Sequence, residues 1–447
     1  VTFKGTKDGA GEARVRTDDE ALTVAAHDIF FDGPRPTCVV RPRDKQQVAQ
    51  VMALASAHRW AVHPRGGGMS YTRGYLAGAP TAVLLDLGGL DRIVAVEADD
   101  LYVTVETAVT WQQLHEHLAA RGLRVPVFGT MSGSTATVGG GLSQGSIFYG
   151  SGLYGTSADM VLGLEVVLPD GTLVRTGQGG VRGAAPFFRY YGPDLSGPFL
   201  GDCGAFGVKV EATLKLISAP QHVGTASFAF DTFEPLHGAQ VAINRAGLAA
   251  ENFAFDAILQ HQLMERTSLL QDVQSLGKLI GGGGRMLKNL RDAVSIATAG
   301  KRFLGDVPYS LHLVVEARHA EAMKAALDEA TAIACEAGGR PLPDTIPRMM
   351  RVQPFGPMDA TLGPEGERWV PTHGCVPISQ GAAAMRRVQE LFGRHRERLL
   401  EHGVLVGLLT ATVAPAVMVI EALFYWRDHP SPLHRAITTP YKYAQGA

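Results

Sequence analysis

Two glycine-dense segments constrain this chain more than any other feature of its sequence. The first runs from Pro64 to Tyr71 (PRGGGMSY), and the second runs from Gly129 to Gly141 (GTMSGSTATVGGG). Because glycine has no side chain, backbone N–H groups in such segments can approach a phosphate closely, and neighbouring Ser and Thr hydroxyls add donors. Each segment is therefore a candidate pyrophosphate cradle, with a plain surface turn as the alternative.

Neither segment matches a common nucleotide-binding motif. No Gly-Lys-Ser or Gly-Lys-Thr follows either of them, which excludes a P-loop. Neither lies in the strand-to-helix setting, with an acidic residue downstream, that a Rossmann fingerprint requires. The segments therefore indicate a different way of binding a phosphate.

The bulk properties of the chain favour small molecules as partners. The formal net charge is −2 over 447 residues and the sequence pI is about 6.8, so charge gives no reason to expect nucleic acid. The four cysteines, Cys38, Cys203, Cys335 and Cys375, contain no CxxC pair. We therefore expect neither a metal site nor a disulfide framework.

The pattern of the chain predicts an α+β or α/β fold with two or three domains. From Thr37 onwards, short β-rich runs alternate with helical ones; Asp44 is expected to cap one helix, and Gly122 to end another. The apolar run from Val404 to Trp426 contains Pro415 and Glu421, so two buried strands are favoured over a membrane span.

The second half of the chain differs from the first. From about Ala219 to Pro415 the strands and helices follow a ferredoxin-like alternation, which is typical of a separate cap domain. We therefore divide the chain into residues 1–220 and 221–447, with a return of the last residues to the first domain as an alternative.

The order of motifs over residues 37–217 resembles the FAD-binding domain of the vanillyl-alcohol oxidase and p-cresol methylhydroxylase superfamily. The motifs are RGGGxS after a strand, ETAVTWQQL, the second glycine segment, YGTSADMVLGLEVVLPDGTLVRTG and GAFGVKVEATLKL. The resemblance implies an α+β fold, in which an FAD-binding domain of two α+β subdomains is joined to a ferredoxin-like substrate cap.

The resemblance also implies which residues contact FAD. They are Pro64, Arg65, Gly66, Gly67, Gly68, Met69 and Ser70; Gly129, Thr130, Ser132, Gly133, Ser134 and Thr135; Val138, Gly139 and Gly140; and Gly207 and Val208. Asp159 and Glu165 are either further ligand groups or residues that satisfy backbone amides in turns and strands. Met69 and Met418 fall where covalent members of the superfamily carry a histidine, so FAD is expected to be bound noncovalently.

In this superfamily a substrate C–H lies over flavin N5, hydride leaves, and a nearby group takes the proton. The candidates for catalytic roles are Tyr149, Tyr154, His373 and Glu421, with Arg351 or Arg348 as an anion anchor. Each has a structural alternative: packing for the tyrosines, an interior position for His373 and a surface position for the arginines. Glu421 is the most anomalous, because an unpaired buried carboxylate is costly.

The predicted function is oxidation of a small organic substrate, such as an aromatic or other alcohol or a para-substituted phenol. One alternative is a D-2-hydroxy-acid dehydrogenase of the lactate or glycolate type, although the HxGxGNxH and GEHG motifs of that branch are missing. Another is an enzyme like alkyl-glycerone-phosphate synthase, without net oxidation, and a third is a structural flavoprotein. Oxygen, a quinone and a cytochrome all stay open as electron acceptors.

The expected location is cytoplasmic, although the chain starts without Met and without a signal pattern, so export stays open. Residues 285–302 form a basic amphipathic stretch. It is interpreted as a solvated helix or as a peripheral membrane or partner contact. A homo-oligomer is a further hypothesis.

Overall fold

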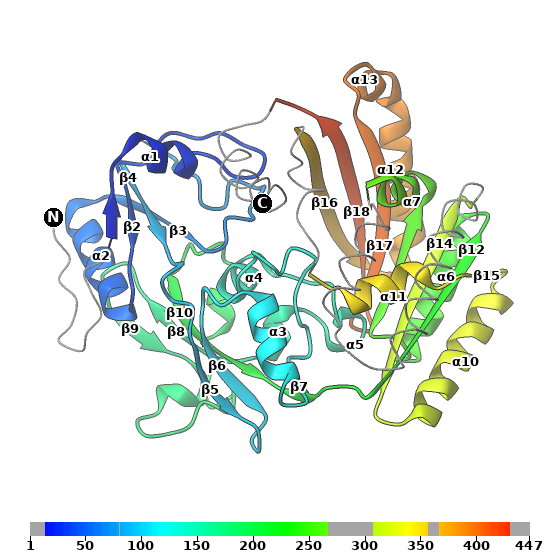
Figure 1. Cartoon of the computed structure of the whole chain (residues 1–447), viewed down its shortest axis with the longest axis horizontal. Helices are drawn as coiled ribbons and strands as arrows, with labels where there is room; N and C mark the ends of the chain where they lie inside the picture. The colour runs from blue at the N-terminus through cyan, green and yellow to red at the C-terminus, as the bar shows by residue number, and fades with distance from the viewer. Residues whose placement is uncertain (1–13, 80, 267–306, 356–365, 430–447) are drawn as a thin grey trace, which may run out of the picture. The chain divides into compact units, whose positions relative to one another are not determined.

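The computed structural model describes residues 14–79, 81–266, 307–355 and 366–429. The chain forms two compact units (Figure 1), of which the second comprises Pro220–Gln353 and Glu367–Arg427. The first contains the chain up to Ala219, and the described residues 354, 355, 366, 428 and 429 cluster with it. The basic stretch 285–302 lies outside the described residues.

The first unit begins with a four-stranded sheet in the order β1-β2-β4-β3. These strands are Arg14–Arg16, Cys38–Arg41, Ala82–Asp86 and Ala61–Arg65, and the last three are parallel. Helix α1 (Asp19–Ala25) precedes β2, and helix α2 (Lys45–His58) joins β2 to β3. The Asp44 side chain accepts a hydrogen bond from the Gln47 amide at 2.8 Å, as expected for a helix cap.

The core of this sheet is apolar, and it reaches across to the next sheet. From helix α2, Val48, Val51 and Met52 pack against the β2 and β4 side chains Val40, Val83 and Leu85, and against Val167 and Val210 of the second sheet. Because α2 buries one apolar stripe against both sheets, it fixes the position of the strand β3 that follows it. The first glycine segment begins at the end of β3.

The second sheet of this unit is antiparallel, in the order β5-β6-β10-β8-β9. Its strands are Ile93–Glu97, Tyr102–Glu106, Val208–Lys215, Val161–Val167 and Leu173–Arg175. The Pro-Asp-Gly turn joins β8 to β9 as a hairpin, which confirms the turn expected there. A small sheet pairs β7 (Leu123–Arg124) with β11 (Ile217–Ser218).

Short helices and 3-10 turns lie in the connections between the strands of this second sheet. Helix α3 (Trp111–Ala119) starts with a capping box between Thr110 and Gln113. The second glycine segment runs into helix α4 (Val138–Gln144), which is followed by helix α5 (Ser151–Tyr154). The 3-10 turns η1 (Ser157–Met160), η2 (Gly177–Gly180) and η3 (Gly197–Phe199) lie further along the chain.

The second unit is built on a seven-stranded antiparallel sheet in the order β15-β12-β14-β13-β17-β18-β16. The strands in chain order are β12 (His222–Phe230), β13 (Glu251–Asp256), β14 (Tyr309–Ala317), β15 (Arg340–Leu342), β16 (Glu367–Pro377), β17 (Leu405–Val413) and β18 (Val417–Arg427). Figure 1 shows β16 beside β18 at one edge of this sheet. The two-strand interpretation of Val404–Trp426 is thereby confirmed as the hairpin of β17 and β18.

The two faces of this sheet are covered by different helices. Helices α6 (Phe233–Arg245), α10 (Ala320–Glu336) and α12 (Gly381–Arg394) pack on one face, against side chains such as Leu311, Leu313 and Met418. On the other face, α7 (Ala257–Arg266) and α11 (Thr345–Val352) contribute Leu259, Ile346 and Met350 to a second cluster. The remaining elements are η5 (Ile378–Gln380) and α13 (Arg396–Glu401).

No helix in the described ranges is both long enough and apolar enough to cross a membrane.

Candidate functional site

The two glycine segments contact each other within the first unit. Gly66 lies against the Thr137 hydroxyl, and Gly67 lies against the carbonyl oxygen of Thr135. A Cβ atom at Gly67 would lie under 3.0 Å from that oxygen, so the close approach of the two backbones requires glycine. The segments that the sequence predicts as two separate cradles thus form one continuous surface.

The first segment carries unsatisfied hydrogen-bond donors. Within the described part of the chain, the backbone N–H groups of Gly66, Gly67, Gly68 and Met69 donate no hydrogen bond to a protein acceptor. The Nε of Arg65 is also buried without a partner, while its guanidinium lies 5.2 Å from the Tyr75 ring centroid. Gly68 is buried and Gly66, Gly67 and Met69 are half-buried. Since buried donors are normally paired, this set of donors fits an anionic ligand such as a pyrophosphate.

The second segment has a defined turn structure. The Gly133 amide donates to Thr130 O at 2.9 Å, and the Ala136 amide donates to Ser132 O at 2.8 Å. The hydroxyls of Thr130 and Ser132 lie 2.8 Å apart. Thr135, in the same turn, contacts Gly67 through its carbonyl oxygen, so the turn lies against the first segment.

A third segment, from Asp202 to Gly207, contacts the first of these segments and the residues just after the second. Gly204 packs against the ring of Pro64, and the Cys203 amide donates to Ser143 O, just after the second segment, at 2.9 Å. A buried ion pair between Lys209 and Asp202, at 2.6 Å, fixes its shape. Gly207 itself is buried against Val166. The predicted FAD contacts from three separate parts of the sequence thus lie in one region of the fold.

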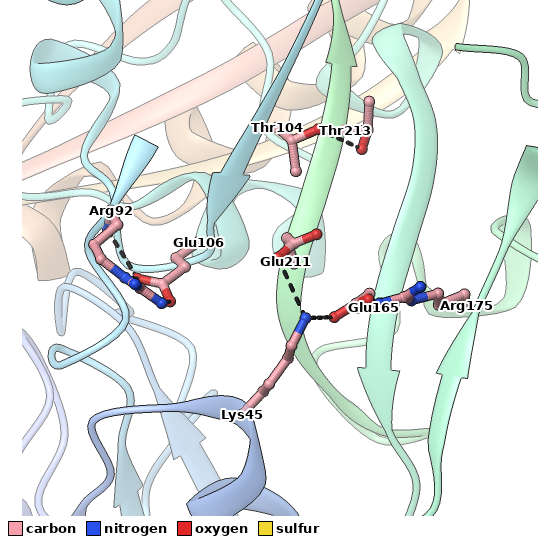
Figure 2. Close-up of polar contacts among 8 residues, drawn as sticks. All are labelled: Lys45, Arg92, Thr104, Glu106, Glu165, Arg175, Glu211 and Thr213. Carbon is pink, nitrogen blue, oxygen red and sulfur yellow. Dashed lines mark hydrogen bonds and ion pairs between the residues drawn. The ribbon is translucent and has the colours of Figure 1, made fainter. Parts of the chain in front are cut away.

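Glu165 is part of an ion-pair network on the second sheet (Figure 2). Its carboxylate contacts both Lys45 and Arg175, and the Lys45 Nζ lies 3.6 Å from Glu211. Burial and the neighbouring Glu165 raise the pKa of Glu211. With two cationic partners, Glu165 has a structural role, but through ion pairs with side chains rather than through the backbone amides that the sequence led us to expect.

Asp159 likewise has a local structural role. Its Oδ2 accepts hydrogen bonds from the Thr156 amide at 2.7 Å and from the Thr156 hydroxyl at 2.8 Å. This arrangement caps the η1 turn. The interpretation of Asp159 as a partner of backbone amides is therefore favoured over a ligand role.

Of the two tyrosines predicted to be catalytic, Tyr149 contacts the second glycine segment. Tyr149 is 2% exposed, stacks on Phe128 with ring centroids 5.1 Å apart, and bonds through its amide to Gly129 O at 3.3 Å. The ring of Tyr154 lies 5.9 Å from the guanidinium carbon of Arg124. Tyr149 therefore packs against the segment, as in its structural alternative.

His373 and Glu421 are brought together in the second unit. They are direct cross-strand partners on β16 and β18, and the His373 Nδ1 lies 3.6 Å from the Glu421 Oε1. Their side chains are 41% and 18% exposed. The Glu421 carboxylate raises the pKa of His373, against the opposing effect of burial. The carboxylate that looked anomalous in the sequence thus has a partner.

Strand alternation places this pair on one particular face of the sheet. The side chains of Met418, Ile420 and Ala422 point into the core under α6, α10 and α12. Because side chains alternate along a strand, Glu421 and its partner His373 lie on the opposite face. Leu409, the cross-strand partner of Glu421 on β17, lies on this face as well.

The candidate anion anchors are engaged in ion pairs. Arg351, on α11, contacts the carboxylates of Glu251, at 3.0 Å, and of Glu316. Arg348 lies 2.9 Å from Asp344, one helical turn away. Arg351 is mostly buried and already neutralised, so its geometry is that of a structural ion pair rather than that of a free anion-binding group.

Met69 and Met418, which fall where covalent members of the superfamily carry the histidine that attaches FAD, lie in apolar surroundings. Met69 packs with Ile29 and Tyr71. Met418 is fully buried in the helix-covered core, and it therefore lies on the other face of β18 from Glu421. The described ranges contain no group of three or more His, Cys, Asp or Glu residues placed to hold a metal ion.

Two contacts at the glycine segments were missed in the sequence. Thr137 separates the predicted residues Thr135 and Val138, and its hydroxyl both contacts Gly66 and accepts from the Gly140 amide at 3.2 Å. Phe355 lies against Gly133, although it follows α11 far along the chain. The Thr-x-x-Gly cap of α4 could have indicated Thr137, whereas no local pattern points to Phe355.

These features define the class of protein. Residues 36–177, which include both glycine segments, match the FAD binding domain family. This part of the chain is therefore an FAD-binding domain of the p-cresol methylhydroxylase type, and FAD is its cofactor. The family and the α+β fold expected from the sequence are thereby confirmed.

Curated relatives match mainly over part of their length. The chain is 28% identical over 278 residues to the mitochondrial D-lactate dehydrogenase (cytochrome) of Arabidopsis thaliana, which is 62% of this chain and 43% of the relative. It is 30% identical over 186 residues to the glycolate oxidase subunit GlcD of Bacillus subtilis, which is 42% of this chain and 38% of the relative. The matched part thus spans less than half of these relatives.

Solved structures show the same fold over nearly the whole chain. The 4-ethylphenol oxidase from Gulosibacter chungangensis matches with a TM-score of 0.69 at 16% identity, over 97% of this chain and 84% of that one. An alkyldihydroxyacetonephosphate synthase matches with a TM-score of 0.67 at 15% identity, over 96% and 80%. At such identities the likeness establishes the fold alone.

Proposed function

We propose that this protein is an FAD-dependent enzyme that oxidises a small organic alcohol or phenol, with His373 and Glu421 handling the proton of the substrate. When bound, FAD supplies a hydride acceptor. The observation that carries the proposal is the His373–Glu421 pair, which lies in the second unit of an FAD-linked oxidoreductase on a sheet face away from α6, α10 and α12. We propose residues 1–220 as the FAD domain and the rest as mainly a substrate cap.

The glycine segments would hold the cofactor through its pyrophosphate. The free amides of Gly66 to Met69 are the donors of the first segment, and the hydroxyls of Thr130 and Ser132 are those of the second. Arg65, within the first segment, adds positive charge. Anions held by several backbone amides are bound without the desolvation of a long flexible side chain.

The His373–Glu421 pair would move the hydroxyl proton. Neutral His373 accepts a proton as the substrate is oxidised, and Glu421 orients the ring and stabilises the imidazolium that results. The raised pKa of His373 makes it a stronger base than a free imidazole. Because of this raised pKa, His373 becomes protonated at a higher pH than an ordinary histidine does.

The surroundings of the pair favour an uncharged substrate. Leu409 lies next to Glu421, and the same face carries Phe253, Phe255 and Leu423. Arg351, the cation considered as an anion anchor, is held by two carboxylates. Both observations support an aromatic or other apolar alcohol, or a para-substituted phenol.

The second candidate is a D-2-hydroxy acid. It is favoured by the curated relatives, two of which are named a D-lactate dehydrogenase and a subunit of a glycolate oxidase. A reaction without net oxidation, as in an alkyl-glycerone-phosphate-synthase-like enzyme, remains a third candidate, for which the likeness in fold is the support.

A substrate panel under anaerobic conditions tests these proposals. The purified protein, loaded with FAD, is mixed with aromatic alcohols, para-alkylphenols, D-lactate and glycolate, and the flavin absorbance is followed. Bleaching by alcohols or phenols supports the first candidate, and bleaching by D-lactate or glycolate alone replaces it with the second. If no compound bleaches the flavin, oxidation of these classes is excluded. Oxygen, a quinone and cytochrome c are then compared as acceptors of the electrons.

A further inference from the structure

We propose that Phe355 is a positioning residue that holds the second glycine segment in its FAD-binding shape and thereby sets the affinity for FAD. The inference rests on the proposed function, since it takes that segment to bind the cofactor. Phe355 follows helix α11 of the second unit, yet it clusters with the first unit. The FAD-binding unit is thus completed by a residue more than two hundred positions away from the segment it contacts.

Phe355 occupies the space next to Gly133. A Cβ atom built at Gly133 would lie 2.5 Å from Cε1 of the Phe355 ring, so the ring fills the volume that any side chain at this position would need. The ring is itself held edge-on by His115, Phe128 and Tyr149, at centroid distances of 5.7, 6.5 and 6.3 Å. Such edge-to-face contacts are favourable and fix the orientation of the ring.

Helix α3 holds the same turn through its backbone. The amide of Gln112 donates to Gly133 O at 3.0 Å, and the amide of Trp111 donates to Ala136 O at 3.2 Å. The turn from Thr130 to Ala136 is therefore fixed both by the first turn of α3 and by the aromatic ring of Phe355. The α3 contacts are hydrogen bonds to the carbonyl groups of Gly133 and Ala136, whereas Phe355 packs against the α-carbon side of Gly133 itself.

The turn so held carries the polar groups proposed for FAD. It presents the paired hydroxyls of Thr130 and Ser132, and Thr135 at its end touches Gly67 of the first segment. Without the ring, Gly133 would gain space and the turn would lose packing on that side. FAD binding would then have to order the turn, and a site that is not preorganised binds more weakly.

The first arm of the test removes the ring in the full-length protein. FAD is stripped, and the dissociation constant for FAD is measured by flavin fluorescence, together with the unfolding midpoint of each apoprotein. Phe355→Ala is expected to weaken FAD binding about tenfold or more. Phe355→Leu retains an apolar contact and should bind within about threefold of the wild type. A purely structural phenylalanine would lower the unfolding midpoint and leave the dissociation constant of the folded protein unchanged.

The matched control is Phe392→Ala. Phe392 makes a comparable edge-to-face contact, with Phe424 at a centroid distance of 5.5 Å, but it lies on α12 in the second unit. This variant should keep the wild-type affinity for FAD. An equal loss of affinity in Phe392→Ala and Phe355→Ala would overturn the specific role of Phe355.

The second arm uses the contact itself. Gly133→Ala places a methyl group where the ring lies, so it should weaken FAD binding about tenfold. In the double variant Gly133→Ala/Phe355→Ala the clash with the ring is gone and only the tighter contact with the Thr130 carbonyl oxygen remains, so the combined loss should be smaller than the product of the two single losses. The inference is overturned if the losses of FAD affinity in the two single variants simply multiply in the double variant. It is also overturned if Phe355→Ala binds FAD with wild-type affinity. If the wild type itself binds no FAD, the proposed function fails instead.

Discussion

At the scale of single residues, the candidate chemistry depends on a pairing across two strands. Glu421 is an interior carboxylate whose partner, His373, comes from the neighbouring strand β16. The pairing partly compensates the cost of a half-buried carboxylate and places a group that can exchange a proton beside it. Two predictions follow from titratable residues at this scale.

Replacement of His373 should remove the proton acceptor without affecting the cofactor. We expect His373→Gln to lower kcat about 100-fold or more, with FAD affinity unchanged, whereas the exposed His402→Gln should behave as the wild type. Since His373 must be neutral to accept a proton, kcat/KM should fall as the pH drops through its raised pKa. Glu421→Gln removes the cause of that raised pKa and should move the fall to lower pH. A pH profile identical in all four proteins would exclude this role.

His312 should make the folded protein sensitive to acid. It is buried between the hydroxyls of Ser227 and Ser310, each 2.8 Å from a ring nitrogen, and burial lowers its pKa from 6.5 to about 3. Between about pH 3 and pH 6.5, His312 therefore binds a proton in the unfolded chain but not in the folded one. Its contribution to the free energy of unfolding is fully present above pH 6.5 and is lost as the pH falls towards about 3. The slope is at most about 1.4 kcal/mol per pH unit.

Urea denaturation at pH 7.5 and pH 5.5 measures this dependence. The free energy of unfolding of the wild type should decrease more between the two pH values than that of His312→Gln, which has no titrating ring. The same decrease in both proteins would assign the acid sensitivity to other groups.

At the scale of elements, the binding surface is made by segments that the chain brings together at the ends of strands and helices. The first segment begins at the end of β3, the second runs into the start of α4, and the third precedes β10. Their contacts are between backbones, as at Gly67 and Thr135 O, and between a ring and a glycine, as at Pro64 and Gly204. Local geometry therefore controls cofactor binding at this scale.

An added methyl group at Gly67 should separate the first two segments. We expect Gly67→Ala to weaken FAD binding about tenfold or more, because its Cβ would meet the Thr135 carbonyl and the backbone has to shift. Gly78→Ala is a suitable control, since a Cβ at Gly78 meets nothing within 4 Å. Fluorescence titration of both variants with FAD makes the comparison. Equal affinities would remove the first segment from the FAD site.

At the scale of the whole molecule, the first unit is assembled from distant parts of the chain. Phe355 clusters with residues before Ala219, although the second unit begins at Pro220. The same unit contains the part that matches the FAD binding domain family. Cofactor binding and the stability of this unit should consequently be linked.

FAD should be released by acid and should stabilise the folded protein. Because Met69 and Met418 replace the expected attachment histidines, acid precipitation is expected to leave the yellow colour in the supernatant. Free FAD at about 100 times its dissociation constant should then add ~2.7 kcal/mol to the stability of the apoprotein, which a thermal unfolding series detects. Colour that stays with the pellet would show a covalent bond instead.

The sequence by itself determined the features that depend on local pattern. The glycine segments, the Asp44 cap, the Pro-Asp-Gly hairpin and the two strands around Pro415 could all be predicted, because backbone propensity and hydrophobic alternation act over a few residues. The order of these motifs also identified the FAD-binding family. The separate roles of Asp159 and Glu165 were left as alternatives, since a carboxylate does not reveal its partner in the sequence.

Only the tertiary structure decided which residues meet. Glu165 pairs with Lys45 and Arg175, Arg351 pairs with Glu251 and Glu316, and Phe355 packs on Gly133. Strand register decided that Glu421 faces His373 and that Met418 faces the helices instead. Such contacts join residues far apart in the chain, and they depend on how whole elements bury their apolar faces, which no local pattern records.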